Sequence, residues 1–323
     1  MSGMPAMPDR RGGAAAPEAG PLGKVDLHCH TNASDNTFGA ADVVRQAAEA
    51  GIAALAITDH DTTAAVAEAA RLGRSLGVDI VPGIEISAYD YERKRRAHIL
   101  GLYIDPAHPA LAALCDPIVE RRTRLSYEMT ERLAAAGYDI AWDDVLRHAG
   151  PGGAAFKQHI MHALVDRGCA KQLFGELYRR LFSRGENGES GIAHLPMQYV
   201  DARDAIRAVL AAGGIPVLAH PGQLGNFEAI PEWVDCGLQG LEVLHPSHSE
   251  EDRSRAARAA AEYGLLVTGG SDFHGGYGDA RWPLGSMDAG AACLAALRER
   301  AWERPARMRA RGRAARAGQG HVW

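Results

Sequence analysis

The sequence predicts an α/β fold built on a parallel sheet, and two observations lead to this expectation. Short, almost uninterrupted apolar segments alternate with segments of helical periodicity along most of the 323-residue chain. This alternation is typical of a parallel sheet that is covered by helices on both faces. In addition, three apolar segments of the second half end in histidine or have one just beyond. Functional groups of α/β proteins gather at the carboxyl ends of strands, so these histidines mark the expected site.

The first half of the chain follows this alternation from Lys24 to Asp105. Gly51 and Gly77 are expected to end the two helices of this region. The strands are recognised by their apolar runs. The expected elements are, in order, a strand at 24–30, a helix at 41–51, a strand at 53–58, a helix at 62–77 and extended segments at 78–87 and 97–104.

The alternation is interrupted at residues 106–200, where the sequence indicates helices with basic and acidic faces. We interpret this stretch as a helical insertion rather than a linker. The alternation then resumes, with a helix expected at 201–214 and strands at 215–220, 240–245 and 265–274. The predicted core therefore consists of residues 24–105 and 201–300, with the insertion between its halves.

The two ends of the chain differ from this pattern. Residues 1–23 are rich in glycine, alanine and proline, and they lack the continuous apolar stretch that a secretory signal needs. We expect a disordered leader there. Residues 301–323 form a basic tail with six arginines after Trp302. It is expected to be a solvated or fraying helix rather than a nucleic-acid contact.

Composition excludes several classes of protein. The formal net charge is −5, whereas a protein that binds nucleic acid in bulk is usually basic. No apolar run approaches the ~18 residues that a membrane helix needs. The five cysteines lack CxxC spacing, which argues against a disulfide scaffold and favours a reducing compartment. We therefore expect a cytoplasmic protein with no membrane association and no stable nucleic-acid partner.

The first candidate metal ligands are His28 and His30, two residues apart on the first expected strand. Side chains alternate across a strand, so the two imidazoles point the same way and can reach one ion. Taken alone, such a pair is more often packed in the core or solvated. Asp26 lies on the same face, where it would either orient a histidine or be a buried strand-end aspartate.

The next motifs supply three further candidates. Asp35 in TNASDNT is explained by turn formation on its own, and Asp61 in TDHD by a helix N-cap. An N-cap does not explain His60, which would sit at the carboxyl end of the second strand. Glu85 lies between two isoleucines in PGIEIS. An isolated buried carboxylate is costly, and a cation would compensate its charge.

Four more residues complete a set of nine: His98 in AHILG, His220 in LAHPG, and Asp272 and His274 in GGSDFH. The glycines around SDFH allow loops to approach closely. Nine groups are too many for one ion and fit two or three. A structural zinc site would favour cysteines and a calcium site oxygen ligands alone. The mixed set suits Mn, Zn or Fe without separating them.

These motifs follow one another in the order of a known family. DLHCHTNASD, ITDHDT, PGIEIS, AHILG, LAHPG and GGSDFH resemble the PHP (polymerase and histidinol phosphatase) family of metal-dependent phosphoesterases, over residues 24–276. The resemblance implies a distorted (β/α)7 barrel with the metals at the carboxyl ends of its strands. It implies one metal held by His28, His30, Glu85 and Asp272, a second by Glu85, His98 and His220, and a third by Asp35, His60 and His274.

The aspartate at position 35, where some members carry histidine, resembles the branch that acts on nucleotides and small phosphorylated sugars and has a helical insertion. Many relatives of that branch carry Arg-x-His at the start of an insertion helix, where this chain has Lys157-Gln158-His159. Lysine keeps the charge but loses the bidentate fork of arginine. Lys157 and His159 would either clamp a substrate phosphate or form a solvated helix start.

His245 and His248 in LHPSHS follow an expected strand and would either reach substrate or serve packing and loop capping.

We expect a hydrolase in which metal-activated hydroxide attacks phosphorus in line with the leaving alkoxide. Its catalytic groups would be His28, His30, Glu85, Asp272 and His274.

The resemblance suggests two rival substrates. One is a nucleoside 3′,5′-bisphosphate or the 5′ end of a short RNA. The other is phosphoribosyl 1,2-cyclic phosphate, which would be opened and then dephosphorylated. Histidinol phosphate is a further alternative, and so is a non-catalytic metal-binding role like that of PHP domains attached to polymerases.

Overall fold

The computed structural model describes residues 23–150, 154–185 and 188–317, with side chains described as far as Glu303. Its strands form one eight-stranded sheet in which β1 to β4 and β6 to β8 follow one another and β5 pairs with β3. The strands are β1 (Lys24–Asp26), β2 (Ile52–Ile57), β3 (Asp79–Asp90), β4 (Arg95–Leu102), β5 (Val200–Asp201), β6 (Ile215–Leu218), β7 (Gly240–Leu244) and β8 (Leu266–Gly269).

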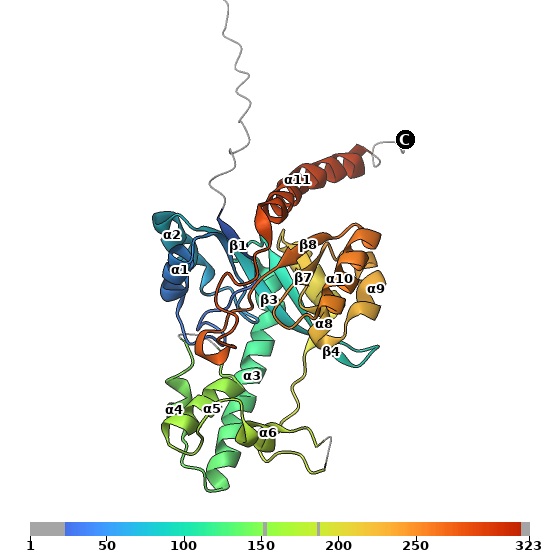
Figure 1. Cartoon of the computed structure of the whole chain (residues 1–323). Helices are drawn as coiled ribbons and strands as arrows, with labels where there is room; N and C mark the ends of the chain where they lie inside the picture. The colour runs from blue at the N-terminus through green and yellow to red at the C-terminus, as the bar shows by residue number, and fades with distance from the viewer. Residues whose placement is uncertain (1–22, 151–153, 186–187, 318–323) are drawn as a thin grey trace, which may run out of the picture.

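Helices cover the sheet, and the predicted α/β class is confirmed (Figure 1). The second helix begins at Val66 rather than at residue 62, because Asp61 adopts a positive φ of 59° and the chain turns before the helix starts. The helices and short 3-10 turns of the core are α1 (Ala40–Glu49), α2 (Val66–Leu76), α7 (Ala202–Ala211), α8 (Pro221–Leu224), η1 (Phe227–Ala229), α9 (Ile230–Asp235), α10 (Glu250–Tyr263), η2 (Gly275–Tyr277) and α11 (Gly290–Ala317).

One strand departs from the expected parallel sheet. β4 runs antiparallel to both of its neighbours, β3 and β6. Only residues 91–94 separate β3 from β4, which is enough for a hairpin but too short for the crossover that a parallel pair needs. The expectation of an all-parallel sheet is therefore wrong at this strand.

The two ends of the sheet meet, as they do in a distorted barrel. The Leu27 amide donates to the Gly269 carbonyl at 3.1 Å, and Cys29 forms an isolated parallel bridge with Phe273. The first strand is accordingly shorter than expected. Its regular pairing with β2 ends at Asp26, and the residues that follow it contact the end of β8 and the segment beyond.

Residues 106–200, expected to form a helical insertion, contain α3 (Pro109–Ala135), α4 (Trp142–Leu146), α5 (Lys157–Asp166) and α6 (Glu176–Phe182). These helices lie together below the sheet in Figure 1, and α3 runs from the sheet into them. They bury an apolar cluster of their own, which includes Met129, Leu133, Ile160, Leu164 and Phe182.

The two terminal predictions concern residues that lie mostly outside the described part. Of the expected leader, Gly23 alone is described. Of the basic tail, the backbone of α11 is described as far as Ala317, without the arginine side chains. Among the described residues, no helix combines the length and the apolar character that a membrane crossing requires.

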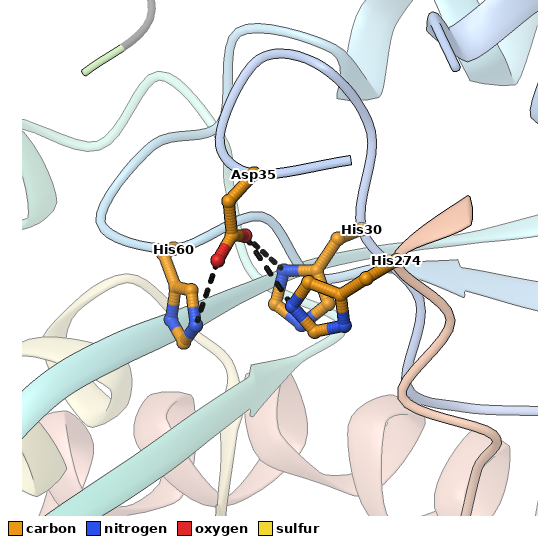
Figure 2. Close-up of side chains that lie close together, drawn as sticks. All are labelled: His30, Asp35, His60 and His274. Atoms are coloured by element: carbon orange, nitrogen blue, oxygen red, sulfur yellow. Dashed lines mark ion pairs between the residues drawn. The ribbon is translucent and has the colours of Figure 1, made fainter. Parts of the chain in front are cut away.

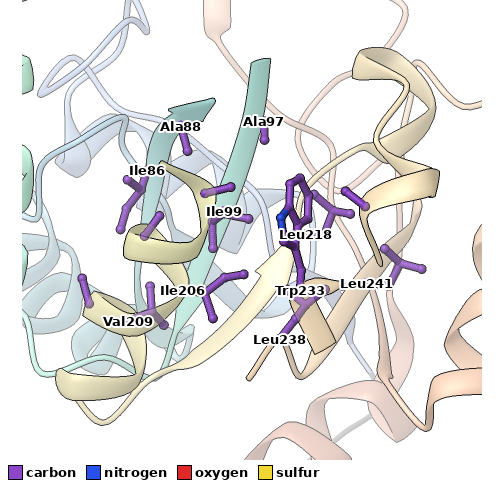
Figure 3. Close-up of a cluster of buried hydrophobic side chains, with 14 of the residues drawn as sticks. Ile86, Ala88, Ala97, Ile99, Ile206, Val209, Leu218, Trp233, Leu238 and Leu241 are labelled. Atoms are coloured by element: carbon purple, nitrogen blue, oxygen red, sulfur yellow. The ribbon is translucent and has the colours of Figure 1, made fainter. Parts of the chain in front are cut away.

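The largest apolar cluster packs α7 and α9 against β3, β4, β6 and β7 (Figure 3). Trp233 of α9 is 1% exposed and lies among Leu218, Leu238 and Leu241. This core fixes the relative positions of strands that carry candidate ligands, including Glu85 on β3.

We predict that Trp233→Ala lowers the free energy of unfolding by about 3–5 kcal/mol, because it leaves a cavity in a close-packed core. Trp302, which is 86% exposed, provides the matched control. Trp302→Ala should change the free energy by less than about 0.5 kcal/mol. Urea unfolding followed by circular dichroism measures both, and similar losses in the two variants would contradict the packing described here.

Candidate functional site

The structure gathers the nine candidate ligands into one cluster at the end of the barrel where β1, β2, β6 and β8 finish. Glu85 lies at the centre of this cluster and is 1% exposed. The members are His28 and His30 after β1, Asp35 in the following loop, His60 after β2, Glu85 on β3, His98 on β4, His220 after β6, and Asp272 and His274 after β8.

One oxygen of the Glu85 carboxylate faces three imidazoles. Its Oε2 lies 3.2 Å from Nε2 of His28 and 3.2 Å from Nε2 of His30. Nδ1 of His60 lies at the same distance of 3.2 Å. The His28 and His30 side chains both reach this oxygen, as expected for residues two apart on an extended chain.

The other oxygen of Glu85 faces two different imidazoles. Oε1 lies 2.8 Å from Nδ1 of His98 and 3.0 Å from Nε2 of His220. His98 pairs opposite Ser87 in the β3–β4 hairpin, two residues from Glu85, so both side chains lie on the same face of the hairpin. The antiparallel direction of β4, which the sequence did not predict, is therefore what positions His98.

A second carboxylate, that of Asp272, faces the same two ring nitrogens as Glu85. Asp272 Oδ1 lies 3.3 Å from His28 Nε2 and 3.1 Å from His30 Nε2. Asp272 adopts a φ of 50°, an uncommon backbone conformation for a residue other than glycine. A Cβ atom at Gly270 would overlap the backbone of His28, so glycine is needed there for the loop to approach β1.

Asp35 joins the cluster from the other side (Figure 2). Its Oδ1 lies 3.4 Å from His274 Nε2 and 3.7 Å from His30 Nδ1, and its Oδ2 lies 4.0 Å from His60 Nε2. Gln158, at the start of α5, donates to Oδ2 at 2.8 Å. This contact connects the insertion directly to the cluster.

These residues fit divalent metal ions. Ligand atoms about 2.1 Å from a tetrahedral ion lie about 3.4 Å apart, close to the 3.1–3.3 Å between the His28 and His30 nitrogens and the two carboxylates. Three buried atoms that point into the cluster, His28 Nε2, Asp35 Oδ1 and His60 Nδ1, have no hydrogen-bond partner. Mixed nitrogen and oxygen donors of this kind suit first-row transition metals.

The charges of the cluster also suit cations. Burial would raise the pKa of Glu85, but the imidazoles of His60, His28 and His98 hold that pKa well below its usual range. The pKa of Asp272 is likewise held low, against burial, by His28 and His274. Burial lowers the pKa of His60 to about 4. At neutral pH these carboxylates are ionised and His60 is neutral. Against burial, hydrogen bonds to Asp272 and Glu85 raise the pKa of His30 to about 10, so a bound cation would displace the proton of that ring.

Glu242 is a buried carboxylate next to the cluster, and the sequence analysis did not single it out. It lies on β7, is fully buried, and its carboxylate accepts a hydrogen bond from His28 Nδ1 at 3.1 Å and another from the His220 amide at 2.8 Å. The first bond leaves the His28 Nε2 lone pair directed at Glu85 and Asp272. An acidic residue between Leu241 and Val243 was the available signal.

Asp26 serves the loop rather than a histidine ring. Its oxygens accept from the Ser271 hydroxyl at 2.6 Å, the Ser271 amide at 2.9 Å and the Gly285 amide at 2.8 Å. Of the two alternatives, the buried strand-end aspartate fits this position. By holding Ser271 against β1, Asp26 fixes the segment that carries Asp272.

A cavity of about 870 Å³ opens from the cluster and separates the barrel from the insertion. Asp35, His60 and His98 lie on its wall, and the insertion forms most of the opposite side. Four basic side chains line it: Arg96, Arg122, Lys157 and Arg184. The cavity therefore joins the candidate metal centre to a basic surface.

Arg122 on α3 is the best-fixed of these cations. It donates to Asp61 at 2.7 Å and to Ser87 at 2.9 Å, and its guanidinium lies 4.6 Å from the centre of the Phe156 ring. Its buried Nε has no partner. The sequence reasoning missed this residue, because nothing distinguishes it from the solvated arginines of the same helix.

The four residues predicted to contact substrate do not all line the cavity. Lys157 lines the cavity, with Nζ 5.1 Å from the centre of the Phe182 ring. His159 is fully buried and its Nδ1 accepts from the Phe156 amide. His245 lies beside the cluster, 3.3 Å from Asp272. His248 donates to the Val243 carbonyl and accepts from the Gly222 amide, which fits its alternative role in loop capping.

Together, the barrel and the cluster define an α/β protein with a candidate metal centre at one end of its sheet. The family model of the PHP domain matches residues 26–150. A phosphoribosyl 1,2-cyclic phosphate 1,2-diphosphodiesterase from Eggerthella lenta is 46% identical over 78% of this chain and 95% of its own length. The chain belongs to the PHP family, and it is a hydrolase of phosphoric esters, as predicted.

Two further proteins are similar over most of their length. A 3′,5′-nucleoside bisphosphate phosphatase from Chromobacterium violaceum is 34% identical over 78% of this chain and 88% of its own. A solved structure from Bifidobacterium adolescentis, described as a metal-dependent phosphoesterase, is 31% identical and has a TM-score of 0.77. It aligns with 85% of this chain and 96% of its own length.

We predict that Glu242→Gln weakens metal binding or lowers kcat/KM by about 10- to 100-fold, because an amide holds the His28 ring in the required orientation less well than a carboxylate. Glu228→Gln, at an exposed glutamate after α8, is the matched control. Metal titration and phosphatase assays of both variants test this. Wild-type metal affinity and activity in Glu242→Gln would show that Glu242 does not orient the ligand.

Proposed function

We propose that the cluster binds two or three divalent cations (Mn, Zn or Fe) and hydrolyses phosphoesters of a small phosphorylated ribose. The support comes from Glu85, whose two oxygens face separate sets of imidazoles, as a carboxylate that bridges two ions would. His28, His30, Glu85 and Asp272 would hold one cation, Glu85, His98 and His220 a second, and Asp35, His60 and His274 a third.

Bound cations would make water nucleophilic at neutral pH and neutralise the phosphoryl oxygens. The protein would contribute positioning. Glu242 would keep the His28 ring in the ligating tautomer, and Asp26 would hold the Asp272 segment in place. Arg122 and Lys157 would bind the anionic groups of the substrate from the insertion side, where the cavity wall carries their charges. Asp35 would be kept in place by the amide of Gln158.

We propose phosphoribosyl 1,2-cyclic phosphate as the substrate. The 46% identity to a relative of that activity exceeds the 34% identity to the bisphosphate phosphatase. A 3′,5′-nucleoside bisphosphate is the second candidate, because the cavity wall includes Tyr89, Tyr91, Tyr178 and Tyr199, and aromatic rings of this kind stack on bases.

A cytoplasmic location remains part of the proposal, and the five free thiols support it.

Phosphorus NMR of the reaction provides the test of this function. With Mn²⁺ present, phosphoribosyl 1,2-cyclic phosphate should first yield a ring-opened phosphomonoester and then inorganic phosphate. A chelator should stop both steps and fresh Mn²⁺ should restore them. His28→Ala should lose both steps, whereas His108→Ala, at a residue that caps α3, should keep them.

Two results would count against the proposal. Preferential release of phosphate from a 3′,5′-nucleoside bisphosphate, with the cyclic compound left intact, would favour the second candidate. Undiminished activity after metal removal and in His28→Ala would exclude the metal mechanism.

We also predict that substrate affinity depends on pH through Lys157. Burial and the charges of Arg184, Arg96 and Arg122 lower the pKa of Lys157 to about 8. A lysine is charged below its pKa, so KM should rise as the pH increases through about 8. In Lys157→Arg the cation persists, so this rise should be absent. KM measured from pH 7 to 9 in both proteins provides the comparison, and parallel profiles would exclude Lys157 as a phosphate contact.

A further inference from the structure

A second group of metal-ligating side chains lies in the insertion, away from the cluster around Glu85. His148 follows α4, and His162 and Asp166 lie on α5. His148 Nε2 is 2.9 Å from Asp166 Oδ2, and His162 Nε2 is 4.0 Å from Asp166 Oδ1. We propose that these three side chains bind a divalent transition-metal ion of the zinc type, as a site separate from the catalytic one.

The geometry of the group suits a single ion. Its three ligand atoms lie within 4.8 Å of one another. Two ligands of one tetrahedral zinc ion lie about 3.4 Å apart, and the distances of 2.9 and 4.0 Å fall on either side of this value. His162 and Asp166 are four residues apart on one helix face. Both rings approach the Asp166 carboxylate, and their centroids lie 3.8 Å apart.

The orientation of His162 is fixed by a partner from the barrel. Its Nδ1 lies 2.9 Å from the hydroxyl of Tyr277, a side chain that is 6% exposed. A tyrosine hydroxyl can accept a hydrogen bond, and His162 Nε2 then carries the lone pair that faces Asp166. Ligating histidines are oriented in this way by a polar group behind them.

The charge of Asp166 is available to a cation. In the part of the chain that the structure describes, no lysine or arginine pairs with Asp166. The neighbouring Arg147 and Arg167 instead pair with Asp144. Two imidazoles and one carboxylate favour Zn, Co, Ni or Cu over Mg and Ca, which prefer oxygen ligands. Asp166 is 57% exposed, so water can occupy the remaining positions on the ion.

A bound ion would connect three segments. It would tie the turn after α4 to α5. Through Tyr277, it would also tie α5 to η2, the short turn that directly follows His274. We therefore expect the ion to stabilise the packing of the insertion on the barrel. The catalytic ligands do not take part, so this inference does not depend on the proposed function.

The test counts bound ions in the full chain. Metal-free protein is equilibrated with Zn²⁺, and the ions per chain are measured by plasma mass spectrometry. Asp166→Asn and His148→Asn should each bind one ion fewer than wild type and retain phosphoesterase activity with Mn²⁺. Asp143→Asn, at an exposed aspartate of α4, should bind the wild-type number. Zn²⁺ should raise the Tm of wild type and of Asp143→Asn more than that of the other two variants.

His148 and Asp166 belong to different segments but would ligate the same ion. Each of the two variants must therefore bind one ion fewer than wild type. An unchanged ion count in either variant would overturn the proposal, as would an equal loss in Asp143→Asn. Circular dichroism of the metal-free proteins checks that the variants are folded.

Discussion

A buried carboxylate surrounded by imidazoles is the interaction on which the rest of this structure depends. Glu85 is 1% exposed, and five histidines lie within 3.2 Å of its oxygens. Taking such a group out of water is costly unless charges and hydrogen bonds compensate it. No single element can supply five imidazoles to one carboxylate. The barrel can, because the segments that follow its strands converge at one end.

Two residues of the cluster adopt unusual backbone conformations that this convergence requires. Asp272 and His220 have positive φ values of 50° and 25°, which are costly for residues other than glycine. The Asp272 carboxylate faces the His28 ring, and the His220 ring faces Glu85. Gly270 allows the Asp272 segment to lie against β1, and Asp26 holds that segment through Ser271. The apolar cluster that contains Trp233 also includes Leu218, two residues before His220.

Much of the candidate site could be predicted from the sequence, because a polar residue within an apolar strand usually needs a partner such as a cation or a hydrogen-bonding group. Glu85 stands out between two isoleucines, and the same reasoning applied to Glu242 would have found it between Leu241 and Val243. The direction of β4 was harder to predict, since an apolar strand has the same pattern in either direction. The short connection at residues 91–94 was the available signal. Arg122 could not be singled out, because a cation on a helix has the same sequence context whether it faces a cavity or solvent.

In the proposed function, the division between barrel and insertion separates the candidate metal ligands from the basic wall of the cavity. All nine candidate ligands belong to the barrel, whereas Arg122, Lys157 and Arg184 reach the cavity from the insertion. A change in the insertion can therefore alter which anion fits without disturbing the groups that would bind metal. Sites placed on a common fold diverge in this manner. The amide of Gln158 on Asp35 is the exception, since it lets the position of α5 act directly on the candidate metal centre. The position of α5 thus affects both the basic wall of the cavity and one carboxylate of the cluster, and in the proposed function this helix would couple substrate binding to the metal centre.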